Sequence, residues 1–365
     1  MKSVSKEIAE SRKNRILIVG NGFDLDLGFN TSYKMFCEAH FKDNVIIDQY
    51  CKSSLFRFLK ERYDKYDNWF NLEDEIRNYV LKSHFTCSST KKKDILYFKY
   101  LNYYIHFWMT TFGYTTEYNE REEYHQDNSN NFDSTVNPCQ VRIPNSDSIA
   151  YDIIKHIVIN ESYFNQIISF NYTKFNNILH CVLGETSCFN QSQLNIKINQ
   201  LPPVQYLHCN FNDDTVILGI EQDVLNKNHH KVKIPKAFSF IQKCNQFSTL
   251  SERQRVIENI ATADELVIFG HSLGTSDSDY FRPLFKDMFA EKPLMERKIT
   301  IITCDNNRDI LKQIEMYAEK DIFLHNNYKN IHFLYTDKKE ESRIALSALF
   351  NGVLNYGLLE NSKKL

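Results

Sequence analysis

The sequence predicts an α/β protein with a Rossmann-like parallel sheet, helices on both faces of that sheet and a helical insertion after the first strand. Three observations predict it. Residues 15–20 form a continuous, β-branched apolar run that ends in glycine, which is typical of a buried parallel strand. From about residue 148, strand-sized apolar runs alternate with segments of helical spacing. A long helical, aromatic-rich stretch separates the first run from the others.

The composition excludes several classes of protein. Hydrophobic residues make up 42% and charged residues 25% of the chain, which is enough apolar material for a packed core. The net charge is −2, so no excess of Lys and Arg exists to coat a nucleic-acid backbone. The apolar runs are shorter than the roughly 18 residues of a membrane helix. The polar N-terminus lacks a signal-peptide core, and the nine scattered cysteines form no CxxC pair. We therefore expect a cytoplasmic protein with free thiols, no metal site and no membrane partner.

The first half of the chain is predicted to hold the insertion. A helix should begin near Ser32, with Thr31 or Ser32 as its N-cap. Residues 45–112 keep helical spacing, and residues 69–82 are amphipathic, with Phe70, Ile76, Tyr79 and Val80 near one face. The spacing therefore predicts one or more helices in this part of the chain.

The domain boundaries follow from changes in composition. Residues 113–147 are polar and Asn-rich, which is typical of a long loop or a disordered insert. We predict that the insertion spans residues 41–147, and that residues 14–40 and 148–355 together form the nucleotide-binding core.

The second half is predicted to supply the other strands and their helices. The strand candidates are residues 166–170, 204–208, 216–220, 266–270, 299–303 and 331–335. The helix candidates are residues 173–183, 251–263, 279–291, 306–319 and 341–351. Helical segments between strands favour a parallel sheet covered on both faces.

Polar and glycine residues follow the predicted strands directly. The first strand leads into GNGFDLDLGFNTSY, the second into Asn171, the third ends at His208, the fourth ends at Gly219 and the fifth leads into HSLGTSDSDYF. Ligands of open parallel sheets bind beyond the carboxyl ends of the strands. We therefore expect these segments to converge on one crevice.

The glycines are concentrated in the same segments. The chain has only ten, yet Gly20, Gly22 and Gly28 lie together, and Gly270 and Gly274 frame a second short segment. Glycines at a strand-to-helix turn let backbone N–H groups approach a diphosphate near the positive end of a helix. A tight turn in which Asp24 caps a helix is the alternative.

The segment FGHSLG also matches the nucleophile-elbow pattern G-x-S-x-G. Ser272 would then be a nucleophile, with His325 or His332 as its base. Against this, large side chains follow the segment where an elbow helix needs small ones, and no HGGG-type oxyanion segment lies upstream. In the competing interpretation, Ser272 and its backbone bind phosphate or ribose.

These motifs resemble the AbiH family of bacterial phage-abortive-infection proteins. GNGFDLDLGFNTSYKMF is similar to its N-terminal signature, WFNLEDEI to its Trp…Leu-Glu element, and FNYT, the His208 segment and FGHSLGTSDSDYF occur in the matching order. The resemblance spans nearly the whole chain except residues 113–147 and the tail. Leu27 and Asn30 depart from the family's usual His and Pro, so no ligand role is carried over for that His. The resemblance implies a phage-defence protein.

The same motif order resembles the wider group of sirtuin-like, NAD-consuming domains. The resemblance implies that Asn171 and His208 are the catalytic Asn and His, and that Ser272 and Leu273 belong to the distal nucleotide loop. Cys209 stands where that group has Gly, and Phe23 and Asp24 stand where sirtuins have small or apolar residues. The chain lacks a four-cysteine zinc ribbon, so removal of acyl groups from lysine is not expected.

Cleavage of NAD needs a particular set of side chains. Nicotinamide is a cationic leaving group, so catalysis depends on holding the ribose while oxocarbenium character develops. An amide such as Asn171 can hold a ribose hydroxyl or a water, and a neutral His208 can accept a proton from either. Asp24 could bond the ribose or orient His208. These residues also have structural alternatives. His208 could be a hydrogen-bonded histidine at the end of a strand, and Asn171 could simply form a turn. Asp277 and Asp279 could cap the helix that follows them. Glu73 and Trp69 could close over the nucleotide or simply pack.

The predicted function follows from these residues. We expect Asn171, His208 and Asp24 to be catalytic in the hydrolysis of the N-glycosidic bond of NAD or a related nucleotide, with no required cofactor. The predicted nucleotide-contacting residues are Gly20, Asn21, Gly22, Phe23, Thr31, Tyr172, Gly270, His271, Ser272, Leu273 and Asp277. The alternatives are a non-catalytic nucleotide sensor that regulates a defence system, and the Ser272 hydrolase. Self-association or a partner protein of the defence system is left open.

Overall fold

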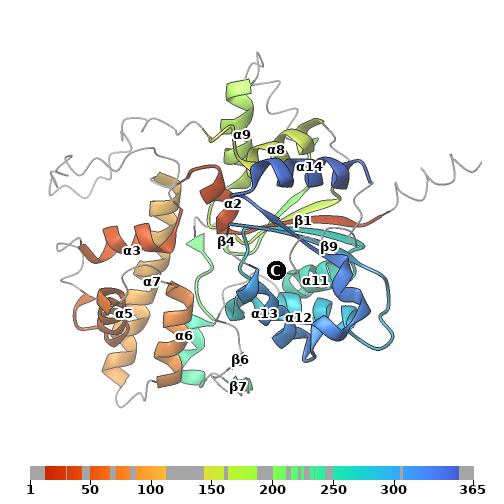
Figure 1. Cartoon of the computed structure of the whole chain (residues 1–365). Coiled ribbons are helices and arrows are strands. Elements are labelled where there is room, and N and C mark those ends of the chain that lie inside the picture. Colours follow the sequence, from red (N-terminus) through yellow and green to blue (C-terminus); the bar gives the residue numbers. More distant parts are fainter. Residues whose placement is uncertain are drawn as a thin grey trace, which may run out of the picture.

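A six-stranded parallel sheet forms the centre of the molecule, in a computed structural model of the chain (Figure 1). The structure describes residues 13–29, 31–42, 50–65, 71–82, 88–111, 144–159, 163–186, 200–210, 215–220, 223–225, 231–233, 235–242, 250–304 and 307–352. The strands of this sheet are β1 (Arg15–Val19), β2 (Gln166–Ser169), β3 (Val204–Tyr206), β8 (Glu265–Phe269), β9 (Lys298–Thr303) and β10 (Ile331–Tyr335). Each adjacent pair is parallel, which confirms the predicted fold class.

The strand order places a topological switch point inside the sheet. The order is β10-β9-β8-β1-β2-β3. The chain therefore runs outward from β1 to β3 at one edge, returns to β8 on the other side of β1, and continues to β10. This is the strand order of the Rossmann fold, whose ligand crevice lies at the carboxyl ends of the two strands flanking the reversal. In this chain those strands are β1 and β8.

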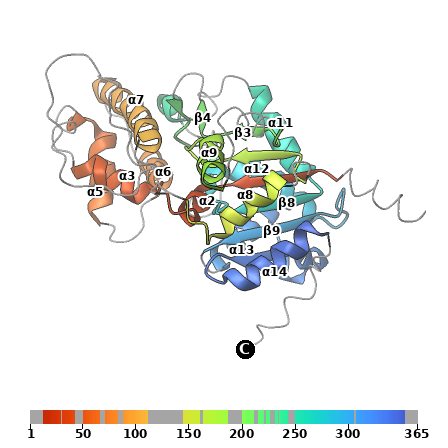
Figure 2. The same ribbon diagram turned by 90° about the horizontal axis from the view of Figure 1, so that it is seen from above.

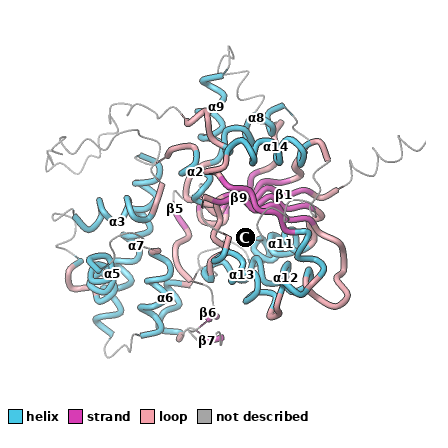
Figure 3. The backbone as a smooth tube through the Cα atoms, in the orientation of Figure 1, coloured by secondary structure: helices cyan, strands magenta, loops and turns pink. Residues whose placement is uncertain are grey.

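Both faces of the sheet are covered because β1 and β8 are apolar at the four consecutive positions that follow their first residue. In β1, Leu17 and Val19 pack into a cluster with helices α8, α9 and α14, whereas Ile16 and Ile18 pack with α11, α12 and α13 on the opposite face. Figure 1 shows these two helical layers above and below the sheet, and Figure 3 separates strands from helices by colour in the same view. The bounds are α8 (Ile149–Ile159), α9 (Phe175–Thr186), α11 (Leu250–Ala261), α12 (Ser278–Met288), α13 (Arg308–Ala318) and α14 (Lys339–Phe350). The five helices predicted after residue 148 are confirmed as α9, α11, α12, α13 and α14.

The insertion after β1 is helical and packs around its own hydrophobic cluster. Its helices are α3 (Tyr33–Lys42), α5 (Ser54–Lys65), α6 (Leu72–Lys82) and α7 (Ser88–Thr111), which stand beside the sheet (Figures 1 and 2). Between β1 and α3 lies the helix α2 (Asn21–Asp26), whose Phe23 packs in the cluster of α8, α9 and α14. The short helix α2 was not predicted. In α6, Ile76, Tyr79 and Val80 are buried, as the amphipathic pattern predicted. Phe70, Trp69 and residues 113–143 of the predicted polar loop lie outside the described residues.

Helix α3 bears on two predictions, the N-cap at Thr31 or Ser32 and the start of the insertion at residue 41. Ser32 caps α3, because its Oγ accepts a hydrogen bond from the backbone N–H of Met35 (3.2 Å). Phe36 and Cys37 of α3 pack in the hydrophobic cluster of the insertion, although the predicted boundary at residue 41 assigns them to the core. The division into domains stays a prediction.

One predicted strand of the sheet is wrong. Residues 216–220 are not part of the parallel sheet, so Gly219 does not close one of its strands. Instead β5 (Thr215–Val216) pairs antiparallel with β4 (Cys209–Asn210), and Ile220 forms an isolated bridge to Gln242. The side chains of this segment are covered by the insertion and not by the helices of the sheet, because Val216, Leu218 and Ile220 are buried in the cluster of the insertion. Their alternation has the period of a strand whichever surface covers it.

The remaining short elements connect the larger ones. They are β6 (Asp223–Leu225) and β7 (Lys231–Lys233), which form an antiparallel pair, and the 3₁₀ helices η2 (Lys236–Ile241), η4 (Thr275–Asp277), η5 (Ile322–Leu324) and η6 (Asn326–Asn330). Of these, η4 is the one that follows β8 and enters the site.

Candidate functional site

Asp24 joins the segments that follow β1 and β2. Helix α2 starts immediately after β1 and places the carboxyl group of Asp24 in the interior, with no exposed surface. Its Oδ1 accepts a hydrogen bond from Nδ2 of Asn171 (2.7 Å), and its Oδ2 accepts one from Oγ1 of Thr173 (2.5 Å). Burial raises the pKa of Asp24 from 3.8 to about 7, against the opposing effect of the two hydrogen bonds. This carboxyl group can therefore exchange a proton near neutral pH.

His208 and Asp277 join the segments that follow β3 and β8. Nε2 of His208 lies 3.1 Å from Oδ1 of Asp277, and both side chains are buried. A carboxylate only accepts hydrogen bonds, so Nε2 carries the hydrogen of this contact. In the neutral ring, Nδ1 is then the nitrogen with the lone pair. The pairing fixes the tautomer and the orientation of the imidazole.

A second imidazole shares the same carboxylate. Nε2 of His271 lies 3.4 Å from Oδ2 of Asp277, and its Nδ1 accepts a hydrogen bond from the backbone N–H of Leu273 (3.0 Å). The ring of Phe170 packs against both imidazoles, with centroid distances of 5.6 Å to His208 and 4.4 Å to His271. Asp277 is thus held between two histidines beside an aromatic ring.

Tyr172 connects the two groups. It follows Asn171 directly, and its ring centroid lies 5.3 Å from that of His208. Its hydroxyl is 2.7 Å from the hydroxyl of Tyr33 and 3.2 Å from Oε1 of Glu73, so the insertion reaches the same place. The pKa values of Tyr172 and Tyr33 are raised well above 10, first by burial and then by the negative charge of Glu73. Both phenols are therefore neutral hydrogen-bonding groups at physiological pH.

The structure brings the three predicted catalytic residues to one end of the sheet. Asp24 contacts Asn171 directly, and His208 packs on the neighbouring Tyr172. The segments involved follow β1, β2, β3 and β8, which are adjacent strands of the sheet. Their catalytic role stays a prediction, and the convergence of the segments provides its geometric basis.

The glycines let two turns of the site approach each other closely, and their predicted contact with a nucleotide stays a prediction. A Cβ on Gly20 or Gly22 would lie 2.7 Å or 2.6 Å from backbone atoms of the Gly270–His271 turn. The N–H of Gly22 donates to the carbonyl oxygen of Gly270 (2.9 Å), and that of Gly20 donates to the carbonyl oxygen of Phe269 (2.8 Å). These N–H groups are satisfied within the protein. The glycines are therefore needed so that the turns after β1 and β8 can pack backbone against backbone.

Among the other predicted nucleotide-contacting residues, Asn21, Thr31 and Ser272 have polar side chains, whereas Phe23 and Leu273 pack in the hydrophobic core. Thr31 donates a hydrogen bond to Oδ1 of Asn21 (2.7 Å), and Ser272 is exposed. By contrast, the ring of Phe23 is fully buried and packs edge-on against Phe269, and the side chain of Leu273 is also fully buried. The side chains of this second pair belong to the hydrophobic core, because the short α2 turns Phe23 inward and a left-handed backbone (φ 52°) turns Leu273 inward.

Three further residues near the site were not predicted from the sequence. The hydroxyl of Tyr317 in α13 lies 2.7 Å from the carbonyl oxygen of Leu273 and 3.0 Å from that of Gly274. Tyr33 bonds Tyr172, and a guanidinium nitrogen of Arg77 in α6 donates to Oγ1 of Thr275. These residues lie far along the chain from their partners, and although Tyr33 ends the motif GNGFDLDLGFNTSY, the motif does not indicate its contact with Tyr172. Glu73 was considered from the sequence together with Trp69, which lies outside the described residues.

The contacts around Ser272 do not favour a hydrolase. The positive φ values of this turn belong to Gly270 (64°) and Leu273 (52°), whereas the nucleophile elbow strains the nucleophile itself. Nε2 of His325 bonds the carbonyl oxygen of Ala290, and His332 lies within β10 beside Thr300 of β9. Within the described part of the chain, no contact pairs Ser272 with a histidine base.

Neither a metal-binding cluster nor a membrane-spanning helix occurs among the described residues. Among them, no group of three or more His, Cys, Asp or Glu side chains is placed to hold a metal ion. No helix in this part of the chain has the length and apolar character needed to cross a bilayer.

The fold and the site define a Rossmann-like α/β protein with a buried polar site at the switch point of its sheet. The family model described as "Bacteriophage abortive infection AbiH" matches residues 16–295. The chain therefore belongs to the AbiH family. The match includes the segments after β1, β2, β3 and β8 that form the site.

Searches for individual relatives found little else. No curated protein matches the chain. Among solved structures, the chain is similar to a crystal structure of Sir2 in complex with the inhibitor EX-527, 2′-O-acetyl-ADP-ribose and a deacetylated p53 peptide. The identity is 10%, the match covers 97% of this chain and 100% of that one, and the TM-score is 0.32. A likeness at this level supports no argument about the site.

Proposed function

We propose that this AbiH-family chain binds NAD or a related nucleotide beyond the carboxyl ends of β1 and β8 and hydrolyses its N-glycosidic bond during phage abortive infection. One observation carries the proposal: the segments after four adjacent parallel strands, on both sides of the switch point, bring Asp24–Asn171 and His208–Asp277 together. Switch-point crevices are where open α/β sheets bind nucleotides. Titratable groups held in pairs at such a place are typical of catalytic sites.

The reaction has a simple balance. The bond between ribose C1′ and the nicotinamide nitrogen breaks, the bonding electrons leave with nicotinamide, and a bond forms between C1′ and a water oxygen. That water loses one proton, so the products are ADP-ribose, nicotinamide and H⁺. The enzyme needs a group that accepts the proton and groups that hold the ribose and the water.

The paired side chains match these needs. His208, oriented through Nε2 by Asp277, presents Nδ1 as the proton acceptor. Asn171 is held by Asp24 and positions a ribose hydroxyl or the water. Asp24 has a pKa of about 7 and therefore either shares a proton or adds negative charge as positive charge develops on the ribose.

The first test measures turnover by the purified full-length chain. Wild-type protein is incubated with NAD, and nicotinamide and ADP-ribose are quantified by liquid chromatography. We expect His208→Ala and Asn171→Ala to lower kcat by about 10²-fold or more, which is typical for the loss of a general base or a positioning group. Calorimetry with NAD on the same preparations separates binding from turnover. Binding without turnover by the wild type would favour the sensor alternative.

The second test follows NAD in cells challenged with phage, with His325→Gln as a matched control. His325 is a histidine whose Nε2 bonds Ala290, away from the Asp277 pair, and it is one of the two candidate bases, with His332, of the Ser272 hydrolase alternative. We expect wild-type and His325→Gln cells to lose NAD, and His208→Ala cells to keep it. Equal NAD levels in all three strains with defence intact would remove the proposal. Loss of activity in His325→Gln alone would revive the hydrolase.

A further inference from the structure

One helix of the insertion contacts two loops of the site. Helix α6 bears Glu73 and Arg77, which are four residues apart and therefore lie on the same face of the helix. Glu73 accepts a hydrogen bond from the hydroxyl of Tyr172, in the loop after β2. Arg77 donates to Thr275, in η4 after β8. The two contacts join a helix of the insertion to the segments that follow two different strands of the sheet, β2 and β8.

Both contacts lead to the same pair of catalytic groups. The ring of Tyr172 packs 5.3 Å, centroid to centroid, from the imidazole of His208. Thr275 belongs to the same short 3₁₀ helix as Asp277, which accepts the hydrogen bond from His208 Nε2. Glu73 thus acts on the imidazole ring, and Arg77 acts on the helix that carries the carboxylate partner of that ring.

The burial of these groups makes the arrangement rigid. Glu73 is 4% exposed and Tyr172 is 8% exposed, so water competes little for their hydrogen bond. Tyr33 of α3 adds a second contact from the insertion, with its hydroxyl 2.7 Å from that of Tyr172. A ring that is hydrogen-bonded at its tip by two helices of the insertion has few alternative orientations. Since this ring forms one wall beside His208, its position limits that of the imidazole.

From these contacts we propose that α6 of the insertion positions the His208–Asp277 pair, with Glu73 and Arg77 as its positioning residues, so that the core is catalytically competent only while the insertion is docked. This inference rests on the proposed function for its catalytic consequence. The positioning itself does not depend on turnover, because it concerns the tautomer and surroundings of His208 and can be observed directly.

Glu75 offers a matched control on the same helix. It is also a buried glutamate, at 5% exposure, but it pairs with Arg62 of α5 (2.8 Å) and faces the interior of the insertion. Substitution of Glu75 should weaken the packing of the insertion without changing the contacts of Tyr172. A general loss of stability would appear in both Glu73 and Glu75 variants, whereas positioning of His208 depends on Glu73.

The experiment combines NMR of the histidine rings with steady-state kinetics on the full-length chain. The His208 ring signals are assigned by their loss in His208→Ala. We expect Glu73→Ala and Arg77→Ala to shift these signals and to lower kcat for NAD about 10-fold or more, with KM within about 2-fold of wild type. Glu73→Gln keeps an oxygen acceptor for the Tyr172 hydroxyl and should restore both readouts to near wild type. Glu75→Ala should leave the His208 signals unchanged.

Each outcome decides one part of the argument. Unchanged His208 signals in both Glu73→Ala and Arg77→Ala would overturn the inference, as would an equal shift in Glu75→Ala. Absence of NAD turnover in the wild type would overturn the proposed function while the NMR result still decides the positioning. Shifted signals with unchanged kcat would show that α6 contacts the pair without controlling its chemistry, which also contradicts the inference.

Discussion

Asp24 illustrates, for a single residue, how burial determines protonation. Its pKa in the folded chain is about 7, above the value of 3.8 for an exposed Asp, because desolvation outweighs two hydrogen bonds. The folded state therefore binds this proton more tightly than the unfolded state. The stabilising contribution is fully present below about pH 4 and is lost as the pH rises through about 7. The carboxyl group is tolerated in the interior chiefly in its protonated form.

The raised pKa of Asp24 predicts how the stability of Asp24→Asn depends on pH. The substitution removes the ionisation, so stability relative to wild type should increase between pH 4 and 8, by up to about 4 kcal/mol. Urea unfolding at four pH values measures the difference, which isolates Asp24 from other titrating groups. Asp309→Asn, at an exposed carboxylate that pairs with Lys312, is the control and should follow the wild-type profile. Parallel curves for Asp24→Asn and wild type would contradict the pKa assignment.

Alanine substitutions at Gly270 and Gly352 should differ in their effect on stability. Gly270 and Gly352 both have positive φ, 64° and 69°, but an added Cβ on Gly270 would lie 2.4 Å from backbone atoms of Gly22 and Phe23, whereas one on Gly352 meets nothing within 4 Å. Gly352→Ala should cost only the left-handed backbone strain, about 1 kcal/mol. Gly270→Ala should cost about 3 kcal/mol or more, or prevent folding, because backbone cannot move aside easily. Equal losses in thermal denaturation would show that the two turns do not approach as described.

At the scale of elements, the sequence predicted what each segment encodes by itself. After their first residues, β1 and β8 are apolar at four consecutive positions because both faces of the sheet are covered, and this pattern is visible in the sequence alone. Residues 216–220 show where the reasoning fails: their alternation predicts a strand but does not specify whether the sheet helices or the insertion cover it. Asn171 and His208 could be predicted because they follow strands. Arg77 and Tyr317 could not, since their contacts depend on how whole helices dock.

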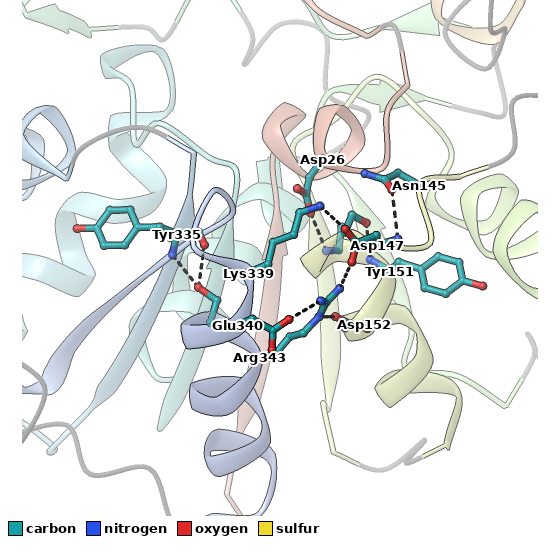
Figure 4. Close-up of polar contacts among 12 residues, drawn as sticks. Asp26, Asn145, Asp147, Tyr151, Asp152, Tyr335, Lys339, Glu340 and Arg343 are labelled. Carbon is teal, nitrogen blue, oxygen red and sulfur yellow. Dashed lines mark hydrogen bonds and ion pairs between the residues drawn. The ribbon is translucent and has the colours of Figure 1, made fainter.

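Helix docking on one face of the sheet depends on a polar network at the start of α8. Asp26 of α2 accepts the N–H of Ala150 (2.8 Å), and Arg343 of α14 bonds both Asp147 and Asp152 at 2.8 Å (Figure 4). The carboxylate of Asp26 thus caps α8 from a neighbouring element. The guanidinium of Arg343 ties α14 to the same helix end.

Substitution of Arg343 tests this network. Arg343→Ala should lower the free energy of unfolding by about 1 kcal/mol at low salt, because a forked network is stronger than a single surface pair. At 1 M salt the loss should largely disappear, since these side chains are partly exposed. Lys312→Ala breaks a single exposed pair with Asp309 and should have no measurable effect at either salt concentration. A salt-independent loss in Arg343→Ala would indicate packing rather than charge.

In the molecule as a whole, the site lies between the parallel sheet and the helices of the insertion. The sheet and its helices enclose two hydrophobic clusters, the insertion encloses a third, and Tyr172 is a member of the third although it follows a strand of the sheet. A ligand held beyond β1 and β8 would therefore contact loops whose positions depend on both the sheet and the insertion. Its binding free energy should stabilise the insertion and the core together.

Hydrogen exchange with and without NAD tests this coupling across the chain. At about 100 times the dissociation constant, NAD should add about 2.7 kcal/mol to the free energy of unfolding. Amide protection should rise in the loops after β1, β2 and β8 and also in α6, because Glu73 and Arg77 join that helix to Tyr172 and Thr275. Helix α14, which lies over the sheet with β10, should change least and is the internal reference. Protection of the loops without any change in α6 would mean that the insertion is a neighbour of the site rather than part of it, because a helix that fixes the imidazole must lose mobility when the ligand fixes the same loops.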